Sequence, residues 1–238
     1  LDNDGWQDLV VAGQPRILFA QNDRAGHFAL RWSLSTVADP VGLSAADFDN
    51  DGDLDIYVCG YRADSNIQSL ASPVPYHDAN NGGRNALFRN DGSFQFVDAT
   101  DAAGLNVNNT RYSFAAAWED FDNDGDLDLY VANDFGRNNL YRNDGGHFTD
   151  IAAQAGVEDI GSGMSVSWGD YNHDGSMDLY VGNMFSSAGN RIAYQRKFAQ
   201  NQSSQTVKHL QRMARGNTLF ESAADGTFLD VSEDANVT

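Results

Sequence analysis

The chain has 238 residues, with 34 Asp and Glu against 15 Lys and Arg, and its formal net charge is −19. This charge argues against nucleic acid as a partner, because phosphate backbones bind to cationic faces. The apolar fraction of 41%, which includes 14 Phe, excludes a disordered chain. No apolar run reaches the ~20 residues that a membrane helix needs. The single cysteine, Cys59, excludes an internal disulfide.

An acidic loop recurs four times along the chain, and an apolar segment follows it each time. The copies are "LDNDGWQDLVV" from Leu1, "DFDNDGDLDIYV" from Asp47, "DFDNDGDLDLYV" from Asp120 and "DYNHDGSMDLYV" from Asp170. A second motif follows each loop, in the forms "RILFAQNDRAGHFAL", "NALFRNDGSFQFVDAT", "NNLYRNDGGHFTDI" and "NTLFESAADGTFLDV". This self-similarity indicates a repeat protein.

Each repeat is predicted to form four short strands. In the third copy the alternating apolar positions place them at 113–118, 127–132, 139–142 and 147–151, and the Asn-Asp-Gly steps are typical of hairpin turns. Four antiparallel strands repeated at this spacing predict an all-β fold, a β-propeller of four-stranded blades. A β-solenoid fits less well, because its coils are much shorter. The predicted domain is 1–238, with units at 1–42, 43–111, 112–162 and 163–238.

The spacing of the carboxylates within each loop predicts a cation site. Calcium takes six to eight hard oxygen ligands, and a tight loop with oxygens at alternate positions supplies them. In the second copy the expected ligands are the side chains of Asp47, Asp49, Asp51 and Asp55 and the carbonyl of Asp53. Magnesium is less suited, because it keeps several of its waters.

The same ligand roles can be assigned in the other three copies. The third copy has Asp120, Asp122, Asp124, Asp126 (carbonyl) and Asp128, and the fourth has Asp170, Asn172, Asp174, Ser176 (carbonyl) and Asp178. Because Asn172 is a neutral donor, the fourth site is expected to bind most weakly of the three complete ones. The first copy keeps Asp2, Asp4, Trp6 (carbonyl) and Asp8 and is a truncated site, since its first ligand would precede Leu1.

An EF-hand is a different kind of calcium loop, and the sequence excludes it. That loop needs a Glu at its twelfth position and a helix on each side. The twelfth positions here are Val58, Val131 and Val181, inside strand-like segments. The loops are therefore calcium loops of a β-protein.

Two insertions, 60–84 and 186–216, separate the second and third strands of their units. The first, with Pro73 and Pro75, is expected to be an irregular loop. The second has Val207, Leu210 and Met213 at helical spacing, which predicts a short amphipathic helix. It also carries six basic residues, namely Arg191, Arg196, Lys197, Lys208, Arg212 and Arg215. This segment is either a basic arm for a partner or a helix held against its own acidic body.

The acidic loop, the "N-x-L-(F/Y)-R-N-D-G" hairpin and the "F-x-D" strand followed by "AG" resemble the FG-GAP/VCBS repeats of integrin-α-like β-propellers. "NMFSSAGNRI" (183–192) is similar to the ASPIC/UnbV and cartilage acidic protein group. The resemblance implies a calcium-bearing propeller of seven or eight blades in a secreted, periplasmic or cell-surface protein used for adhesion. Its calcium loops would lie away from the interaction face. Since four units are visible, we expect the rest of the ring to lie outside this chain.

The sequence lacks the common catalytic motifs, such as G-x-S-x-G or H-E-x-x-H, so no catalytic residue is predicted. The expected function is a noncatalytic, calcium-stabilised scaffold for an extracellular protein or glycan. The alternative is a carbohydrate-active propeller, a lectin or a polysaccharide lyase. A lyase needs a proton-accepting side chain beside an arginine, and the insertions offer Arg62, Tyr76, His77, Arg84 and Arg191.

Overall fold

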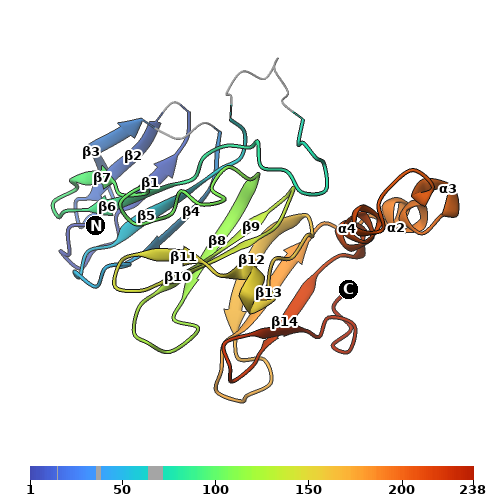
Figure 1. The fold of residues 1–238 in the computed structure, drawn as a ribbon. Coiled ribbons are helices and arrows are strands. Elements are labelled where there is room, and N and C mark those ends of the chain that lie inside the picture. The colour runs from blue at the N-terminus through green and yellow to red at the C-terminus, as the bar shows by residue number, and fades with distance from the viewer. Residues whose placement is uncertain (15, 36–38, 64–71) are drawn as a thin grey trace.

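A computed structural model describes residues 1–14, 16–35, 39–63 and 72–238, and its strands form four antiparallel sheets in chain order (Figure 1). The first sheet contains β1 (Leu9–Ala12), β2 (Arg16–Asn22) and β3 (Phe28–Ser35). The second contains β4 (Pro40–Ala46), β5 (Asp55–Gly60), β6 (Ala86–Asn90) and β7 (Phe96–Asp98). The third contains β8 (Ser113–Glu119), β9 (Asp128–Asn133), β10 (Asn139–Asn143) and β11 (Phe148–Asp150). The fourth contains β12 (Gly163–Gly169), β13 (Asp178–Asn183), β14 (Thr218–Ser222) and β15 (Phe228–Asp230).

Each sheet pairs its strands with their neighbours in sequence, which is the arrangement predicted for propeller blades. The all-β fold class is therefore confirmed, and β8–β11 match the four strands expected in the third unit. The first sheet has three strands, and β1–β3 correspond in order to β5–β7. β4 begins at Pro40, three residues before the boundary that the sequence suggested between the first two units. The unit limits themselves stay a prediction.

The second strands of the second and third blades are buried on both of their faces. In β9, Leu129 and Val131 pack in the core shared with the second sheet, whereas Tyr130 and Ala132 pack in the core shared with the fourth. Successive side chains of a strand point to opposite faces. A strand between two sheets therefore reads as the continuous apolar run "DLYV" rather than as an alternating pattern.

Aromatic pairs join neighbouring blades at equivalent places. The ring of Tyr57 meets that of Trp118 edge-on at 6.2 Å and 86°. Tyr130 and Trp168 repeat this contact one blade further, at 6.2 Å and 85°. The large apolar residues that the repeats share are thus the contacts between blades, which are the main cores of the molecule.

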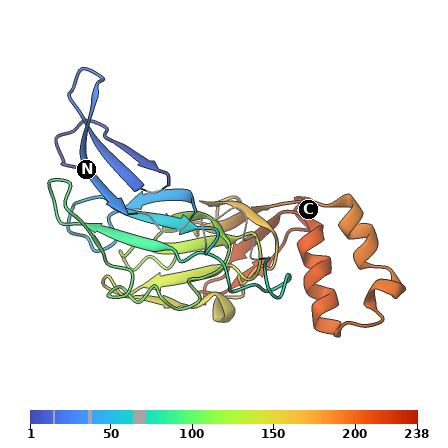
Figure 2. The ribbon, with the colours of Figure 1, turned by 90° about the horizontal axis from the view of Figure 1, so that it is seen from above.

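The second insertion forms a helical arm at the far end of the molecule from the first sheet (Figure 2). It contains α2 (Ser187–Ala193), α3 (Arg196–Ala199) and α4 (Ser204–Arg215), while the short α1 (Ala152–Ala155) belongs to the third blade. The predicted amphipathic helix is confirmed as α4, whose first turn is capped by Ser203, the hydroxyl of which accepts the N–H of Thr206 at 3.0 Å. None of the helices in the described part of the chain has the length and apolar character that a bilayer crossing requires.

The first insertion approaches this arm from the second blade. Residues 64–71 of the insertion 60–84 lie outside the described residues. Further along, the ring of Tyr76 contacts that of Phe135 at 5.0 Å, and the ring of His77 lies 5.5 Å from that of His209 on α4. Two insertions that are far apart in sequence therefore meet at one edge of the fold.

Candidate metal centre in the acidic loops

The acidic loops join the first and second strands of a blade, and the two insertions join the second and third. An acidic loop precedes the second strand of its blade, and an insertion follows that strand, so the two lie at opposite ends of the same strand. The acidic loops therefore lie at one end of the strands of a blade, and the insertions lie at the other end. The expectation that calcium loops lie away from an interaction face stays a prediction.

All four acidic loops share one backbone conformation. The residue after the second acidic position has a positive φ in every copy, between 57° and 61°, at Asn3, Asn50, Asn123 and His173. Asn and His tolerate this left-handed region better than most residues do. The glycine two positions later has the same property, as with Gly52 at φ 92°, and allows the sharp turn that the spacing predicted.

The first carboxylate of each complete loop caps the turn. Asp47 accepts the N–H of Asp51 at 3.0 Å through Oδ1 and that of Gly52 at 2.9 Å through Oδ2. Asp120 and Asp170 accept the equivalent pairs of N–H groups at 3.0 Å. These bonds hold each loop in its tight turn.

The last carboxylate is buried at the start of the second strand. Asp55 accepts the N–H of Phe48 at 3.1 Å and that of Asn90 at 2.8 Å, and so joins the loop to the hairpin of its blade. Asp128 and Asp178 make the same two kinds of bond. Burial raises the pKa of Asp55 and of Asp128 to about 7, although the two N–H donors favour the charged form.

Two of the loops gather three carboxylates close enough for a single ion. The groups are Asp47, Asp49 and Asp55 in the second loop and Asp120, Asp122 and Asp124 in the third, and in each the ligand oxygens lie within 4.8 Å of one another. In the second loop Oδ1 of Asp49 is buried without a hydrogen-bond partner. An acceptor left unsatisfied in this way is costly, and a hard cation is a suitable partner for it. Each of the two groups could hold a metal ion.

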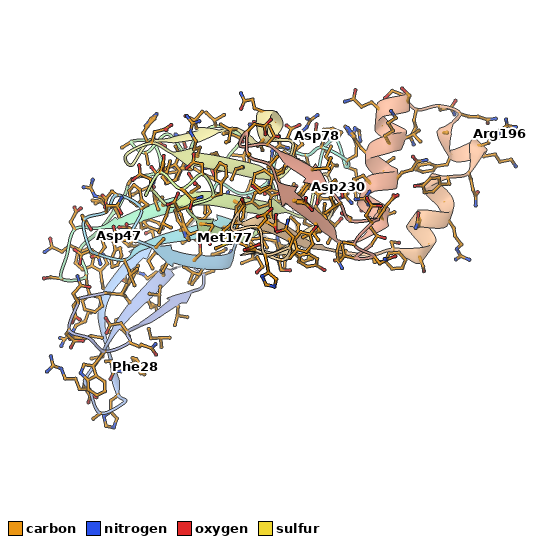
Figure 3. All side chains as sticks on the ribbon, turned by 90° about the horizontal axis from the view of Figure 1, so that it is seen from below. Phe28, Asp47, Asp78, Met177, Arg196 and Asp230 are labelled. Carbon is orange, nitrogen blue, oxygen red and sulfur yellow. The ribbon has the colours of Figure 1, made fainter. Side chains whose placement is uncertain are left out.

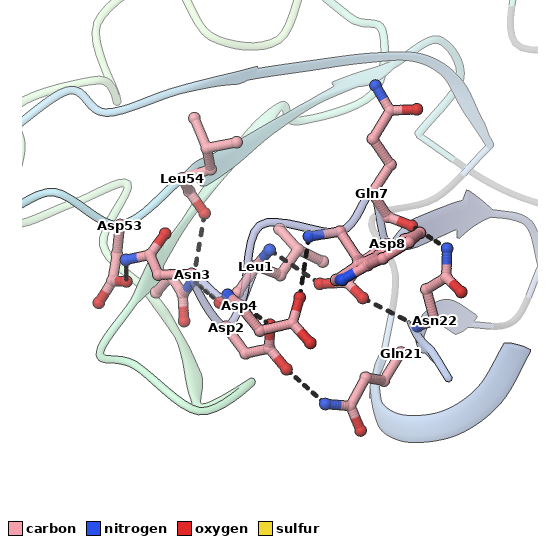
Figure 4. A network of polar contacts seen from close by, with 12 residues as sticks. Leu1, Asp2, Asn3, Asp4, Gln7, Asp8, Gln21, Asn22, Asp53 and Leu54 are labelled. Carbon is pink, nitrogen blue, oxygen red and sulfur yellow. Dashed lines mark hydrogen bonds and ion pairs between the residues drawn. The ribbon is translucent and has the colours of Figure 1, made fainter. Parts of the chain in front are cut away.

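The carboxylates of the first loop form polar contacts with other groups of the chain (Figure 4). The amino group of Leu1 pairs with Asp8 at 2.9 Å, Arg24 pairs with Asp4 at 3.2 Å, and the amide of Gln21 donates to Asp2. Each of the three carboxylates thus has a donor already. Trp6 donates its N–H to Asp4 at 2.9 Å, and a ligand role for its carbonyl stays a prediction.

In the fourth loop, the predicted neutral ligand forms hydrogen bonds with another residue of the same loop. The amide of Asn172 donates to Oδ2 of Asp174 at 3.0 Å, and its oxygen accepts the N–H of Asp174 at the same distance. Among the described residues, neither this loop nor the first assembles a third carboxylate at ion-binding distance. Two of the four predicted sites therefore gather carboxylates that could hold a metal ion. The ligand assignments in the other two loops stay predictions, as do those of Asp51, Asp53, Asp126 and Asp128.

Asparagines that are not predicted ligands connect the loops of neighbouring blades. The amide of Asn3 donates to Asp53 at 2.8 Å, and that of Asn50 donates to Asp126 at 2.9 Å. In the hairpins, the amide of Asn143 donates to the carbonyl of Phe48 in the preceding blade at 2.8 Å. Their recurrence in the "DND" and "RND" motifs was the available signal, but only the fold shows that the bonds cross between blades.

The residues considered for a lyase have separate environments. Arg62 pairs with Asp39, and Arg84 pairs with Asp98 at 3.2 Å and with Asp101 at 2.9 Å. Tyr76 and His77 contact Phe135 and His209 through their rings, as described above, and Arg191 lies on α2. Both insertion arginines near the second blade thus have carboxylate partners. Cys59 is fully buried, and burial raises the pKa of its thiol to about 12, which suits a core residue.

The model of one family, the FG-GAP-like repeat, matches residues 1–58, 78–131 and 120–181. These segments cover more than half of the chain and include all four acidic loops. The chain belongs to the FG-GAP-like repeat family. Repeats of this family are propeller-type, in agreement with the observed blades.

Comparisons beyond the FG-GAP-like family model add little. No curated protein matches the chain. A chain in the crystal structure of BBS1N in complex with ARL6DN, soaked with lead, is similar at a TM-score of 0.44 and 12% sequence identity. The alignment covers 77% of this chain and 48% of that one, so the FG-GAP-like chain spans about half the length of that relative.

Proposed function

We propose that this FG-GAP-like chain is a calcium-stabilised, noncatalytic scaffold for binding an extracytoplasmic protein or glycan. The observation that carries the proposal is the grouping of Asp47, Asp49 and Asp55, with the buried oxygen of Asp49 lacking a partner. Hydrogen bonds to backbone N–H groups already orient Asp47 and Asp55. Carboxylates held this close repel one another, and a divalent cation would neutralise them.

The bonds between the acidic loops and the adjacent blades favour a structural role for the ion. Asp49 and Asp122 would hold it with the other carboxylates of their loops, and those loops are bonded to the adjacent blades through Asn50 and Asn143. A calcium ion bound there supplies positive charge and oxygen coordination. The residues of the chain orient the carboxylates and link each loop to its neighbour, so binding would stabilise the contacts between blades as well as the loop.

The setting of the proposal follows from the kind of ion and from the motif resemblance. Calcium modules outside the cell work at dissociation constants of about 10⁻⁴–10⁻³ M, which exposed loops of this kind can satisfy. The likeness to integrin-α propellers and to the ASPIC/UnbV group adds adhesion as the proposed context. Arg62 and Arg84, two of the three arginines considered for a lyase, are engaged by carboxylates, which disfavours a sugar-cleaving role for them.

Thermal unfolding with and without calcium tests the proposal. An ion present at ten times its dissociation constant stabilises the folded chain by about 1.4 kcal/mol per site. We therefore expect millimolar calcium to raise the melting temperature relative to a chelator, and magnesium to do so less. Asp49→Asn and Asp122→Asn should reduce this gain.

A matched control removes the same charge away from the loops. Asp234 is exposed, and Asp234→Asn should keep the full calcium response. Identical melting curves in calcium and in chelator would refute the calcium part of the proposal. A calcium response that survives Asp49→Asn combined with Asp122→Asn would show that the ion binds elsewhere.

A further inference from the structure

The helical arm, residues 184–216, is the basic part of an acidic molecule. It contains six Arg and Lys residues and no Asp or Glu, in a chain whose net charge is −19. Figure 3 shows Arg196 on this arm and Asp47 of the second acidic loop at opposite ends of the molecule. Such a separation of charge gives the arm an electrostatic character of its own.

Among the described residues, two of these basic side chains form ion pairs with the body. Arg212 pairs with the buried Asp159 at 2.6 Å, and Arg215 pairs with Asp230 at 2.6 Å. The other four, Arg191, Arg196, Lys197 and Lys208, are exposed and form no ion pair with the described residues. Attachment of the arm to its own propeller therefore accounts for a third of its charge and leaves four cations for another anion.

The arm that carries these cations also lines an apolar pocket. The pocket has a volume of about 470 Å³ and is lined mainly by aliphatic and aromatic groups, among them Phe185, Ile192, Phe198, Leu210 and Met213, with Tyr76 from the first insertion. Phe185 and Ile192 are 62% and 47% exposed. Arg191 directly precedes Ile192, and Lys197 directly precedes Phe198. These cations and lining residues therefore belong to the same two helices, α2 and α3.

The walls of the pocket are held from both insertions. Tyr76 packs against Phe135, while His77 and His209 bring the first insertion against α4. Ser186 caps α2 by accepting the N–H of Gly189 at 2.9 Å. Binding to a cavity that exists before the ligand arrives loses less entropy than binding that must first form one.

We infer that this pocket binds an acidic peptide segment of a partner protein, which inserts an aliphatic or aromatic side chain while its carboxylates meet Arg191, Arg196 and Lys197. The inference rests on the scaffold function proposed above and names the partner class. The charge of the arm calls for an anion, and the aliphatic lining calls for an apolar anchor. A sugar ring needs more hydrogen-bonding groups than this lining offers.

Fluorescence anisotropy with a defined peptide tests the inference on the 238-residue chain. The probe is the labelled peptide DEEDLEDFLEDE, in which acidic residues surround two leucines and a phenylalanine. One comparison peptide carries Lys in place of each acid, and another carries Ser in place of each apolar residue. We expect saturable binding of the probe and affinity at least about tenfold lower for each comparison peptide.

Variants of the arm locate the binding site. Arg191→Glu combined with Lys197→Glu reverses charge beside the pocket, and Phe185→Ser removes an exposed part of its wall. Each should weaken binding at least about tenfold. The matched control, Arg16→Glu combined with Arg31→Glu on the first sheet, should bind within about twofold of the unmodified chain. Circular dichroism and melting temperature establish that every variant is folded.

Several results would overturn the inference. They are the absence of probe binding, equal binding of the serine-substituted peptide, unchanged binding by the arm variants, and displacement of the probe by phosphatidylserine vesicles. The proposed function is tested separately, because its calcium response depends on Asp49 and Asp122. A chain stabilised by calcium that fails to bind the probe refutes only the peptide site, and the converse result refutes only the calcium role.

Discussion

At the residue scale, single asparagines connect one blade to the next. Asn143 donates through its amide to the carbonyl of Phe48 at 2.8 Å and to that of Leu127 at 3.1 Å. Its side-chain oxygen accepts the N–H of Gly146 at 2.8 Å, and its own N–H donates to Asp128. Asn90 makes a corresponding set of bonds, including one to the carbonyl of Leu1 in the first blade at 3.0 Å. One side chain thus forms hydrogen bonds with backbone groups of a loop, of a hairpin and of a neighbouring blade.

Removing this amide should be costly. We expect Asn143→Ala to lower the free energy of unfolding by about 2–4 kcal/mol, because it leaves several buried backbone groups without a partner. Ser222 occupies the equivalent hairpin position in the fourth blade, and Ser222→Ala should cost less than about 1 kcal/mol. Urea denaturation in the presence of calcium measures both. Equal losses would show that the amide bonds between blades contribute little.

At the scale of elements, the helical arm contacts the rest of the molecule through ion pairs and through a ring contact between two histidines. Arg212 and Arg215 bind carboxylates of the body, and His209 contacts His77. Burial lowers the pKa of His209 from its ordinary value of 6.5. His77 and Arg137 lower it further, while Asp78 and Glu158 act in the opposite direction. The contact between the two insertions therefore favours a neutral imidazole.

This contact should weaken in acid. Because the pKa of His209 is lower in the folded state, the stability from its neutral form is present above pH 6.5, its ordinary pKa, and is lost as the pH falls through the lowered value. We expect the protection factors of α4 amides in hydrogen exchange to fall between neutral pH and pH ~5, relative to those of β9. His209→Gln should remove this difference. Protection of α4 that tracks β9 at every pH would contradict the prediction.

At the scale of the whole molecule, stability comes from cores between blades rather than within them. The forward face of the second sheet contributes Tyr57 and Leu87 to such a core, and that of the third contributes Tyr130 and Leu140. The fourth sheet presents the same kind of face, with Tyr180 and Leu219, along a cleft of about 580 Å³. Within the described residues no further sheet covers it.

Equivalent tyrosines should therefore contribute unequally. Tyr130 is fully buried and donates its hydroxyl to the carbonyl of Val157 at 2.9 Å, whereas Tyr180 is half-buried at the cleft. We expect Tyr130→Ala to lower the free energy of unfolding by about 3–5 kcal/mol and Tyr180→Ala by less than about 2 kcal/mol. Urea denaturation of the 238-residue chain compares the two. A loss for Tyr180→Ala as large as that for Tyr130→Ala would show that its face is packed in solution.

The sequence by itself determined the features that depend on residues close together in the chain. The repeats, the four strands of the third blade, the turn at Gly52 and Gly125, and α4 all follow from local spacing and turn chemistry. The same is true of the acidic loops, because all of their predicted ligands lie within nine residues.

Only the tertiary structure decided which groups meet across the molecule. In the folded chain, Tyr76 and His77 lie next to an arm that is more than a hundred residues away in sequence. Arg212 and Arg215 form ion pairs, whereas the other four cations of the arm form none within the described part of the chain. The amides of Asn50 and Asn143 donate to groups of neighbouring blades. The tertiary structure also showed that two of the four loops gather three carboxylates, since the donors that occupy the first loop include Gln21 and Arg24 from the adjoining hairpin. Such contacts depend on how the blades and insertions pack, and local spacing does not encode that packing.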